Sequence, residues 1–226
     1  MEPLGAVKAV VFDAYGTLFD WASAAEQARD VLGERWRELA ETWRAKQLQY
    51  TWLRSLQGRH ADFLAVTADA LDFALAGLGL EGAGLRARLL ALYERVEAYP
   101  DAAETLARLR AAGRATAILS NGTPAMLAAA VEHARLGSLL DDVLSVEAAG
   151  IYKPHPSVYA LATARLGLPA ERILFVSANG WDAFAAKAFG FRVAWCNRGG
   201  QPPERLPERP DVEIGALAEV PGLPGM

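Results

Sequence analysis

Val10-Val11-Phe12-Asp13-Ala14-Tyr15-Gly16-Thr17 joins an apolar run to an acid and a tight turn. An apolar run rich in β-branched residues is typical of a buried parallel strand. A carboxylate directly after such a strand, close to turn amides and the Thr17 hydroxyl, stays ionised and fixed in direction, as a nucleophile requires. For this motif alone, an N-cap or turn aspartate is the simpler alternative.

Further apolar runs follow at intervals that leave room for helices. The stretch Asp101 to Ala112 has helical spacing and is followed by Gly113, a residue that commonly ends a helix. Because strands and helices alternate, the sequence predicts an α/β core. The expected strands are Val7 to Phe12, Ala115 to Leu119, Ile173 to Val176 and Val193 to Trp195, with Asp211 to Ile214 as a closing edge strand.

The segment between the first strand and Glu97 has long helical patterns and no convincing strand. Gly77 to Gly84 separates two of these patterns, and Tyr99-Pro100-Asp101 marks the return to the core, because proline disfavours helix in the residue before it. We therefore expect a helical cap at residues 21–96, inserted into a discontinuous core of residues 1–20 and 97–226. Its expected helices are Ala24 to Leu32, Trp36 to Leu56, His60 to Leu78 and Leu85 to Val96.

Composition limits the partners of the chain. Of 226 residues, 52% are hydrophobic and 22% charged, as in ordinary globular proteins, and 23 basic against 27 acidic residues give a net charge of −4. This balance argues against binding to nucleic acid or to an anionic membrane. The single Cys196 excludes an intramolecular disulfide. We expect no signal peptide or membrane anchor, and a cytoplasmic location.

Three more polar clusters accompany the expected strands. They are Ser120-Asn121-Gly122-Thr123-Pro124, Tyr152-Lys153-Pro154-His155-Pro156 and Ser177-Ala178-Asn179-Gly180-Trp181-Asp182. The carboxyl ends of parallel strands meet at one edge of a sheet, where ligands bind. The first cluster suits an anion, although it is also plain turn chemistry. Lys153 would neutralise the acids and pair with Asp182, whereas His155 between two prolines is expected to be structural.

The order Asp13, Thr17, Ser120, Lys153 and Asp182 resembles the haloacid dehalogenase superfamily over essentially the whole chain. This resemblance implies a Rossmann-like core with a cap. Most members are magnesium-dependent phosphatases with a second acid two residues after the first, where this chain has Tyr15. Ser177 and Asn179 stand where phosphatases place metal-binding carboxylates, so we predict a reaction without metal or other cofactor.

Three stretches resemble one branch of that superfamily, the L-2-haloacid dehalogenases: Asp13 to Asp20, Trp43 to Leu56 and Ser177 to Asp182. The resemblance implies that Asp13 attacks C2 of an L-2-haloalkanoate, expels halide and forms an ester, which water hydrolyses to a D-2-hydroxy acid. Correct orientation of the two reactants contributes up to roughly 7–11 kcal/mol to such a displacement.

The same resemblance assigns a role to each catalytic candidate. Thr17 and Ser177 would orient Asp13, and Lys153 would balance its charge. Asp182 with Asn179 would hold Lys153 and the hydrolytic water. Arg44 and the amide of Asn121 would receive the halide; without the resemblance, Arg44 and Leu48 only share one face of an amphipathic helix.

Substrate-binding candidates follow in the same way. Ser120 would bind the substrate carboxylate, with backbone N–H groups near Ala14, Tyr15 and Asn121 sharing the anion. Tyr159 either hydrogen-bonds within the site or packs against the core. Ala45 follows Arg44 where relatives carry a larger polar residue, which leaves the substrate range open. The expected apolar wall consists of Tyr15, Leu48, Phe63 and Trp181.

Other functions remain open at this stage. The same machinery suits another activated C2 centre or fluoroacetate, and a magnesium-dependent phosphatase is disfavoured by Tyr15. A non-catalytic binding protein would be expected to lack Asp13, Lys153 or Asp182, and all three are present. The expected partners are a small halogenated carboxylate and water, with no nucleic acid or membrane. The resemblance also suggests a homodimer.

Overall fold

A single parallel sheet organises the structure, a computed structural model that describes residues 7–80 and 82–226. Its strand order is β3-β2-β1-β4-β5-β6, so that β1 lies inside the sheet between β2 and β4. The α/β class and the parallel sheet predicted from the sequence are confirmed. The strands are β1 (Ala9–Phe12), β2 (Ala115–Ser120), β3 (Asp142–Ser145), β4 (Ile173–Ser177), β5 (Arg192–Cys196) and β6 (Val212–Ile214).

Strand β3 was not expected from the sequence. It pairs with β2 from Asp142 to Ser145, and its sequence Asp-Val-Leu-Ser has polar residues at both ends. Because β3 is the edge strand, it needs less apolar surface than the inner strands, and Val143 is partly exposed. The expected edge strand at residues 211–214 is present as β6 on the opposite edge.

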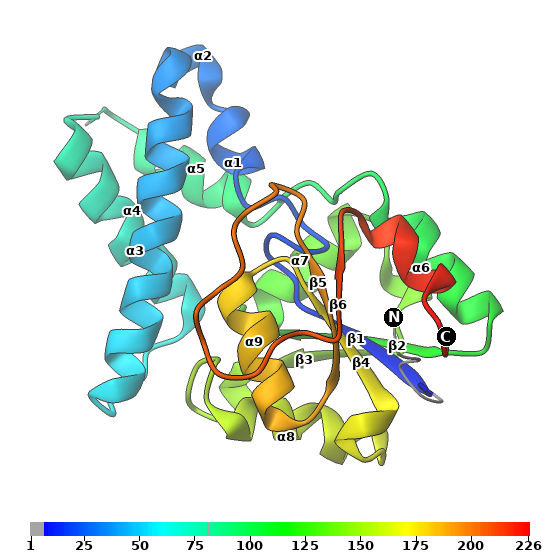
Figure 1. The fold of residues 1–226 in the computed structure, drawn as a ribbon. Coiled ribbons are helices and arrows are strands. Elements are labelled where there is room, and N and C mark those ends of the chain that lie inside the picture. The colour runs from blue at the N-terminus through cyan, green and yellow to red at the C-terminus, as the bar shows by residue number, and fades with distance from the viewer. Residues whose placement is uncertain (1–6, 81) are drawn as a thin grey trace.

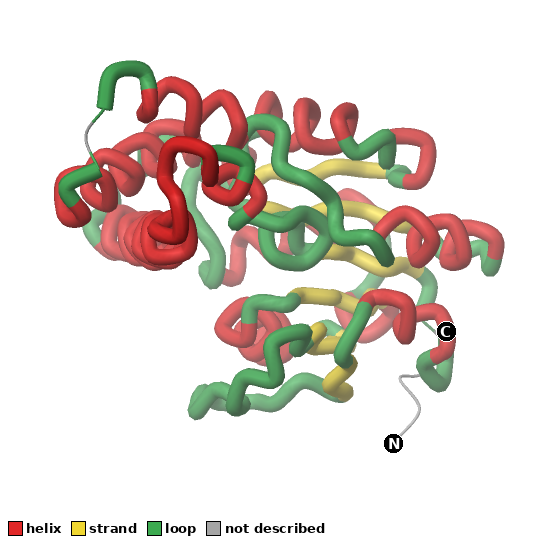
Figure 2. The backbone as a smooth tube through the Cα atoms, turned by 90° about the horizontal axis from the view of Figure 1, so that it is seen from above, coloured by secondary structure: helices red, strands yellow, loops and turns green. Residues whose placement is uncertain are grey.

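Helices cover both faces of this sheet (Figure 2). Thr123 caps α7 by accepting a hydrogen bond from the Met126 amide, and Pro124 occupies the first turn. His155 caps α8 in the same manner through the Ser157 amide, which agrees with its expected structural role. The helices are α6 (Ala102–Ala111), α7 (Pro124–His133), α8 (Pro156–Leu166) and α9 (Gly180–Phe189).

A lobe of helices lies beside the sheet (Figure 1), and α3 and α4 pack along each other in it. The expected helix over residues 24–32 is wrong, because the structure has two short helices there. The expected start at His60 is also wrong, since the Asp62 carboxylate accepts from the Ala65 amide and α4 begins at Phe63. The helices are α1 (Ser23–Glu26), α2 (Arg29–Leu32), α3 (Trp36–Leu56), α4 (Phe63–Leu78) and α5 (Leu85–Tyr93).

Two antiparallel segments connect the lobe to the sheet. The Asp20 amide donates to the Glu97 carbonyl at 2.8 Å, and the Tyr99 amide donates to the Leu18 carbonyl at 2.9 Å. α5 ends at Tyr93 rather than continuing to Val96 as expected, and this leaves residues after it free to make the connection. No helix in the described ranges has both the length and the apolar composition that crossing a membrane requires.

Candidate active site

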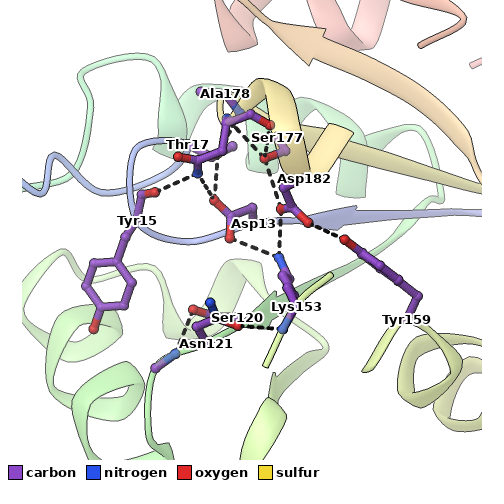
Figure 3. A network of polar contacts seen from close by, with 12 residues as sticks. Asp13, Tyr15, Thr17, Ser120, Asn121, Lys153, Tyr159, Ser177, Ala178 and Asp182 are labelled. Carbon is purple, nitrogen blue, oxygen red and sulfur yellow. Dashed lines mark hydrogen bonds and ion pairs between the residues drawn. The ribbon is translucent and has the colours of Figure 1, made fainter. Parts of the chain in front are cut away.

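Polar side chains meet where β1, β2 and β4 end (Figure 3). Asp13 directly follows β1, Ser120 ends β2 and Ser177 ends β4, while Lys153 comes from the loop before α8. The backbone turns sharply at Gly16, whose φ of 96° lies in a region that other residues rarely adopt. A β-carbon at Gly16 would lie 3.6 Å from Asn179 Nδ2, an ordinary contact distance, so the positive φ rather than a lack of space favours glycine here.

The Asp13 carboxylate is held on both oxygens. Its Oδ1 accepts from Lys153 Nζ at 3.0 Å, and its Oδ2 accepts from Asn179 Nδ2 at 2.8 Å and from the Thr17 hydroxyl at 3.1 Å. The Ala178 amide donates to Thr17 Oγ1 at 2.8 Å, which leaves the hydroxyl hydrogen directed at Asp13. Only 6% of Asp13 is exposed, so the carboxylate is fixed and largely desolvated.

Lys153 lies between two carboxylates and is 1% exposed. Its Nζ donates to Asp182 Oδ2 at 2.9 Å as well as to Asp13. Burial alone would lower the pKa of Lys153, but the charges of Asp13 and Asp182 outweigh it and raise the pKa. The lysine therefore carries its positive charge inside the protein.

Asp182 is fully buried and has three donors. Besides Lys153, the Tyr159 hydroxyl donates to its Oδ1 at 2.7 Å and the Ser177 hydroxyl to its Oδ2 at 3.0 Å. Burial raises the pKa of Asp182, against the opposite effect of Lys153. Tyr159 thus hydrogen-bonds within the site, which was one of the two alternatives left open by the sequence.

Two expected contacts differ in the structure. Ser177 contacts Asp182 rather than Asp13, because its hydroxyl lies at the start of the turn into α9 and faces the first turn of that helix. Asn179 contacts Asp13 rather than Lys153. Ser177 therefore supports Asp182, and Asn179 supports Asp13.

Arg44 reaches this site from α3. Its Nη2 donates to the Tyr15 carbonyl at 3.2 Å and to Asn179 Oδ1 at 3.3 Å, and its Nη1 donates to Gln47 Oε1 at 2.8 Å. The guanidinium carbon lies 5.9 Å from the centre of the Trp21 ring. A cation from the lobe and a carboxylate from the sheet therefore share Asn179 as a neighbour.

The loop after β2 is held by several hydrogen bonds, one of them with the Lys153 backbone. Ser120 is buried, and its hydroxyl accepts from the Gly122 amide at 3.1 Å. Asn121 Oδ1 accepts from the Lys153 amide at 3.1 Å. The Ser145 hydroxyl donates to the Gly122 carbonyl at 2.6 Å and ties this loop to the end of β3.

The expected apolar wall is only partly assembled. Tyr15 and Phe63 are in contact, with ring centres 5.7 Å apart, and the Tyr15 ring extends away from Asp13 (Figure 3). Trp181 packs instead against Trp52, with 5.4 Å between ring centres. Leu48 is half-buried on α3, and Ala14 is fully buried under the turn.

Three neighbours of the site were not identified from the sequence. Tyr93 stacks on Tyr15 with ring centres 5.5 Å apart, and Gln47 and Trp21 contact Arg44. Gln47 is three residues after Arg44 on one helix, and this spacing was the available signal. Tyr93 had none, because the fold brings it to the site from a distant helix.

The same side chains also bear on metal binding. The structure, over the residues it describes, has no group of three or more His, Cys, Asp or Glu residues arranged to hold a metal ion. The two acids of the site are instead bonded to one lysine. The expectation of a reaction without metal stays a prediction.

In this sheet, an aspartate follows the first strand and is paired with a lysine, which is paired in turn with a second aspartate. This arrangement is typical of hydrolases that use an aspartate as nucleophile. The model of haloacid dehalogenase-like hydrolases matches residues 7–190, and the chain belongs to this family. Among similar proteins, (S)-2-haloacid dehalogenase of Xanthobacter autotrophicus is 49% identical over 83% of this chain and 74% of its own. (S)-2-haloacid dehalogenase 4A of Burkholderia cepacia is 46% identical over 88% and 86%.

Solved structures agree with these sequence relatives. The L-2-haloacid dehalogenase of Xanthobacter autotrophicus, solved with chloropropionic acid covalently bound, has a TM-score of 0.89 and 42% identity, covering 96% of this chain and 97% of that one. A dehalogenase solved with an intermediate complex has a TM-score of 0.94 and 43% identity, covering 97% and 98%. The fold class expected from the resemblance is confirmed.

Proposed function

We propose that this protein hydrolyses the carbon–halogen bond of short L-2-haloalkanoic acids and releases halide and a D-2-hydroxy acid. The observation that carries the proposal is the fixed, desolvated Asp13 carboxylate, held by Lys153 on one oxygen and by Asn179 and Thr17 on the other. Its relatives are dehalogenases, one of them solved with chloropropionic acid covalently bound.

In the first step, a carboxylate oxygen of Asp13 forms a bond to C2 while the bond from C2 to the halogen breaks. The halide leaves with the bonding electron pair, and the configuration at C2 inverts once. Arg44, which shares Asn179 with Asp13, is the cation that receives the halide. Because Asp13 is fixed and nearly dry, little reorganisation precedes the attack.

In the second step, water attacks the carbonyl carbon of the Asp13 ester. Negative charge then develops on a carboxyl oxygen, and both oxygens of Asp13 already face donors, Lys153 on one side and Asn179 with Thr17 on the other. Cleavage of the acyl–oxygen bond releases the hydroxy acid and restores the Asp13 carboxylate, with one proton released overall. Asp182 keeps Lys153 charged and in place throughout.

We assign the substrate carboxylate to the loop after β2, where Ser120, Asn121 and backbone N–H groups meet, together with those near Ala14 and Tyr15. The apolar substituent of the substrate is assigned to the aromatic wall. Tyr15 and Phe63 form this wall through their ring contact, whereas Trp181 packs against Trp52 and is not part of it. Tyr159 acts through Asp182.

We also propose that residues 21–96 form a cap on a core of residues 1–20 and 97–226. Arg44 would then extend from the cap to the Tyr15 carbonyl of the core. A homodimer is supported by an apolar groove of about 820 Å³ that includes Trp52, Leu56 and Leu206. Leu56 is 85% exposed, and a second copy would cover it. We place the protein in the cytoplasm, because its single cysteine is buried and free.

The test is halide release by the purified protein from L- and D-2-chloropropionate, each with and without a chelator, beside an aryl phosphate with magnesium. We expect release from the L-enantiomer only, unaffected by chelator and abolished in Asp13→Asn, which keeps the shape of the side chain without its nucleophilic charge. Magnesium-dependent phosphate release would overturn the proposal. Absence of halide release, with fluoroacetate included, would favour another activated C2 centre.

A further inference from the structure

Gln47 is a buried amide inside the lobe, one helical turn after Arg44 on α3. It is 1% exposed. Its Oε1 accepts from Arg44 Nη1 at 2.8 Å, and its Nε2 donates to the Thr67 hydroxyl of α4 at 2.7 Å. An apolar side chain would bury at such a helix–helix contact with less desolvation cost, so the amide needs another explanation.

The orientation of this amide is determined by its neighbours. The Thr67 hydroxyl donates its hydrogen to the Phe63 carbonyl at 2.6 Å, so its oxygen is left to accept from Gln47. The amide nitrogen of Gln47 must therefore face Thr67, and its oxygen must face Arg44. Trp43 Nε1 donates to the Thr67 carbonyl at 2.8 Å and fixes α4 against α3.

The Tyr93 hydroxyl also contacts the Gln47 amide. The Tyr93 hydroxyl lies 3.3 Å from its Oε1 and 3.1 Å from its Nε2. Tyr93 also stacks on Tyr15, the residue whose carbonyl accepts from Arg44. Gln47 thus belongs to a buried network that positions one guanidinium.

The charge state of the partners matters as much as their geometry. Arg44 donates to the side-chain oxygens of Gln47 and Asn179 and to the Tyr15 carbonyl, all of them neutral. A carboxylate at position 47 would hold the guanidinium equally well but would neutralise it. A neutral amide orients the cation and leaves its charge for an incoming anion.

We infer that Gln47 is a positioning residue that directs the Arg44 guanidinium toward the leaving halide; this rests on the proposed dehalogenase function. The contribution of Gln47 to the reaction rate is larger for a leaving halide that needs more electrostatic stabilisation. Chloride leaves less readily than bromide, so loss of this support slows reaction of the chlorinated substrate more. A residue that only stabilises the fold would affect both substrates equally.

The test compares the unmodified protein with Gln47→Met, Gln47→Glu and the control Gln49→Met, which lies on the exposed side of the same helix. The readouts are kcat/KM for L-2-chloropropionate and L-2-bromopropionate, and inhibition by sodium bromide. Loss of a hydrogen bond to a charged group corresponds to roughly a tenfold or larger effect. We therefore expect Gln47→Met to weaken bromide inhibition about tenfold and to lower the chloride-to-bromide ratio of kcat/KM several-fold.

Gln47→Glu has nearly the same shape, so it separates charge from packing. We expect it to weaken bromide inhibition more than Gln47→Met does, and Gln49→Met to match the unmodified protein. Equal loss on both substrates with unchanged bromide inhibition in both Gln47 variants would overturn the inference while leaving the dehalogenase proposal intact. If the unmodified protein released no halide from either acid, the proposed function itself would fail, and this inference with it.

Discussion

Lys153→Met tests whether one lysine holds the site together. Its Nζ lies 3.0 Å from Asp13 and 2.9 Å from Asp182, so the two carboxylates are no more than about 6 Å apart. Without the lysine they repel each other by about 3 kcal/mol at an effective dielectric constant of 20. Removing one partner from a buried ion pair typically costs 3–5 kcal/mol, and we expect a loss in that range at pH 8.

The pH dependence of this loss identifies its cause. In the variant, one carboxylate escapes repulsion by keeping a proton, so its pKa in the folded state rises above the unfolded value of about 3.9. The folded state then binds more protons than the unfolded state between these two values, and its stability increases as the pH falls. We expect the deficit to shrink by about 1.4 kcal/mol per pH unit below the raised pKa.

The assay is urea denaturation of the unmodified protein and Lys153→Met at pH 8, 6.5 and 5, with Lys46→Met as control. Lys46 lies on α3 and donates to Gln49 at 2.8 Å, outside the site. A deficit below about 1 kcal/mol at pH 8, comparable with a surface pair, would refute the reasoning. So would a deficit of equal size at pH 8 and pH 5.

Two further predictions concern the surroundings of the site. A β-carbon at Gly122 would lie 3.0 Å from both the Tyr15 ring and Leu127, so Gly122→Ala should displace that ring. We expect KM for L-2-chloropropionate, measured by halide release, to rise by about tenfold with a smaller change in kcat. Although burial acts in the opposite direction, hydrogen bonds from Arg198 lower the pKa of Asp101. Its ionised form therefore stabilises the fold above about pH 4 and loses this effect as the pH falls. The difference in urea midpoint between the parent and Asp101→Asn should shrink from pH 7 to pH 3.5, and an unchanged difference would contradict this assignment.

The inner strands were predictable from the sequence because burial on both faces demands continuous apolar runs, as in β1 and β4. Edge strand β3 escaped prediction for the same reason, since it is covered less and has polar ends. The start of α4 depends on its cap at Asp62, which hydrophobic spacing does not register. The catalytic candidates next to strands came together as expected, because parallel strands end at one edge.

The sequence predicted which residues belong to the site better than it predicted which of them hydrogen-bond to each other. Asn179 and Ser177 are two residues apart, and the turn between them directs one side chain to Asp13 and the other to Asp182. Hydrophobic periodicity carries no information about that turn. Tyr93 reaches Gln47 through packing of a distant helix, which a single sequence does not encode as a local pattern, whereas Gln47 lies one helical turn after Arg44 on α3.

In the proposed reaction, Asn179 keeps the nucleophile Asp13 and the halide-binding cation Arg44 close together without a direct ion pair between them. Its Nδ2 donates to Asp13 while its Oδ1 accepts from Arg44. A direct ion pair between Asp13 and Arg44 would stabilise the ground-state carboxylate and occupy the cation that the halide needs. With a neutral amide between them, negative charge can move from Asp13, beside Lys153, to the halide, beside Arg44. Each end of that displacement then has its own cation, and the cation that receives the charge is still available when the carbon–halogen bond breaks.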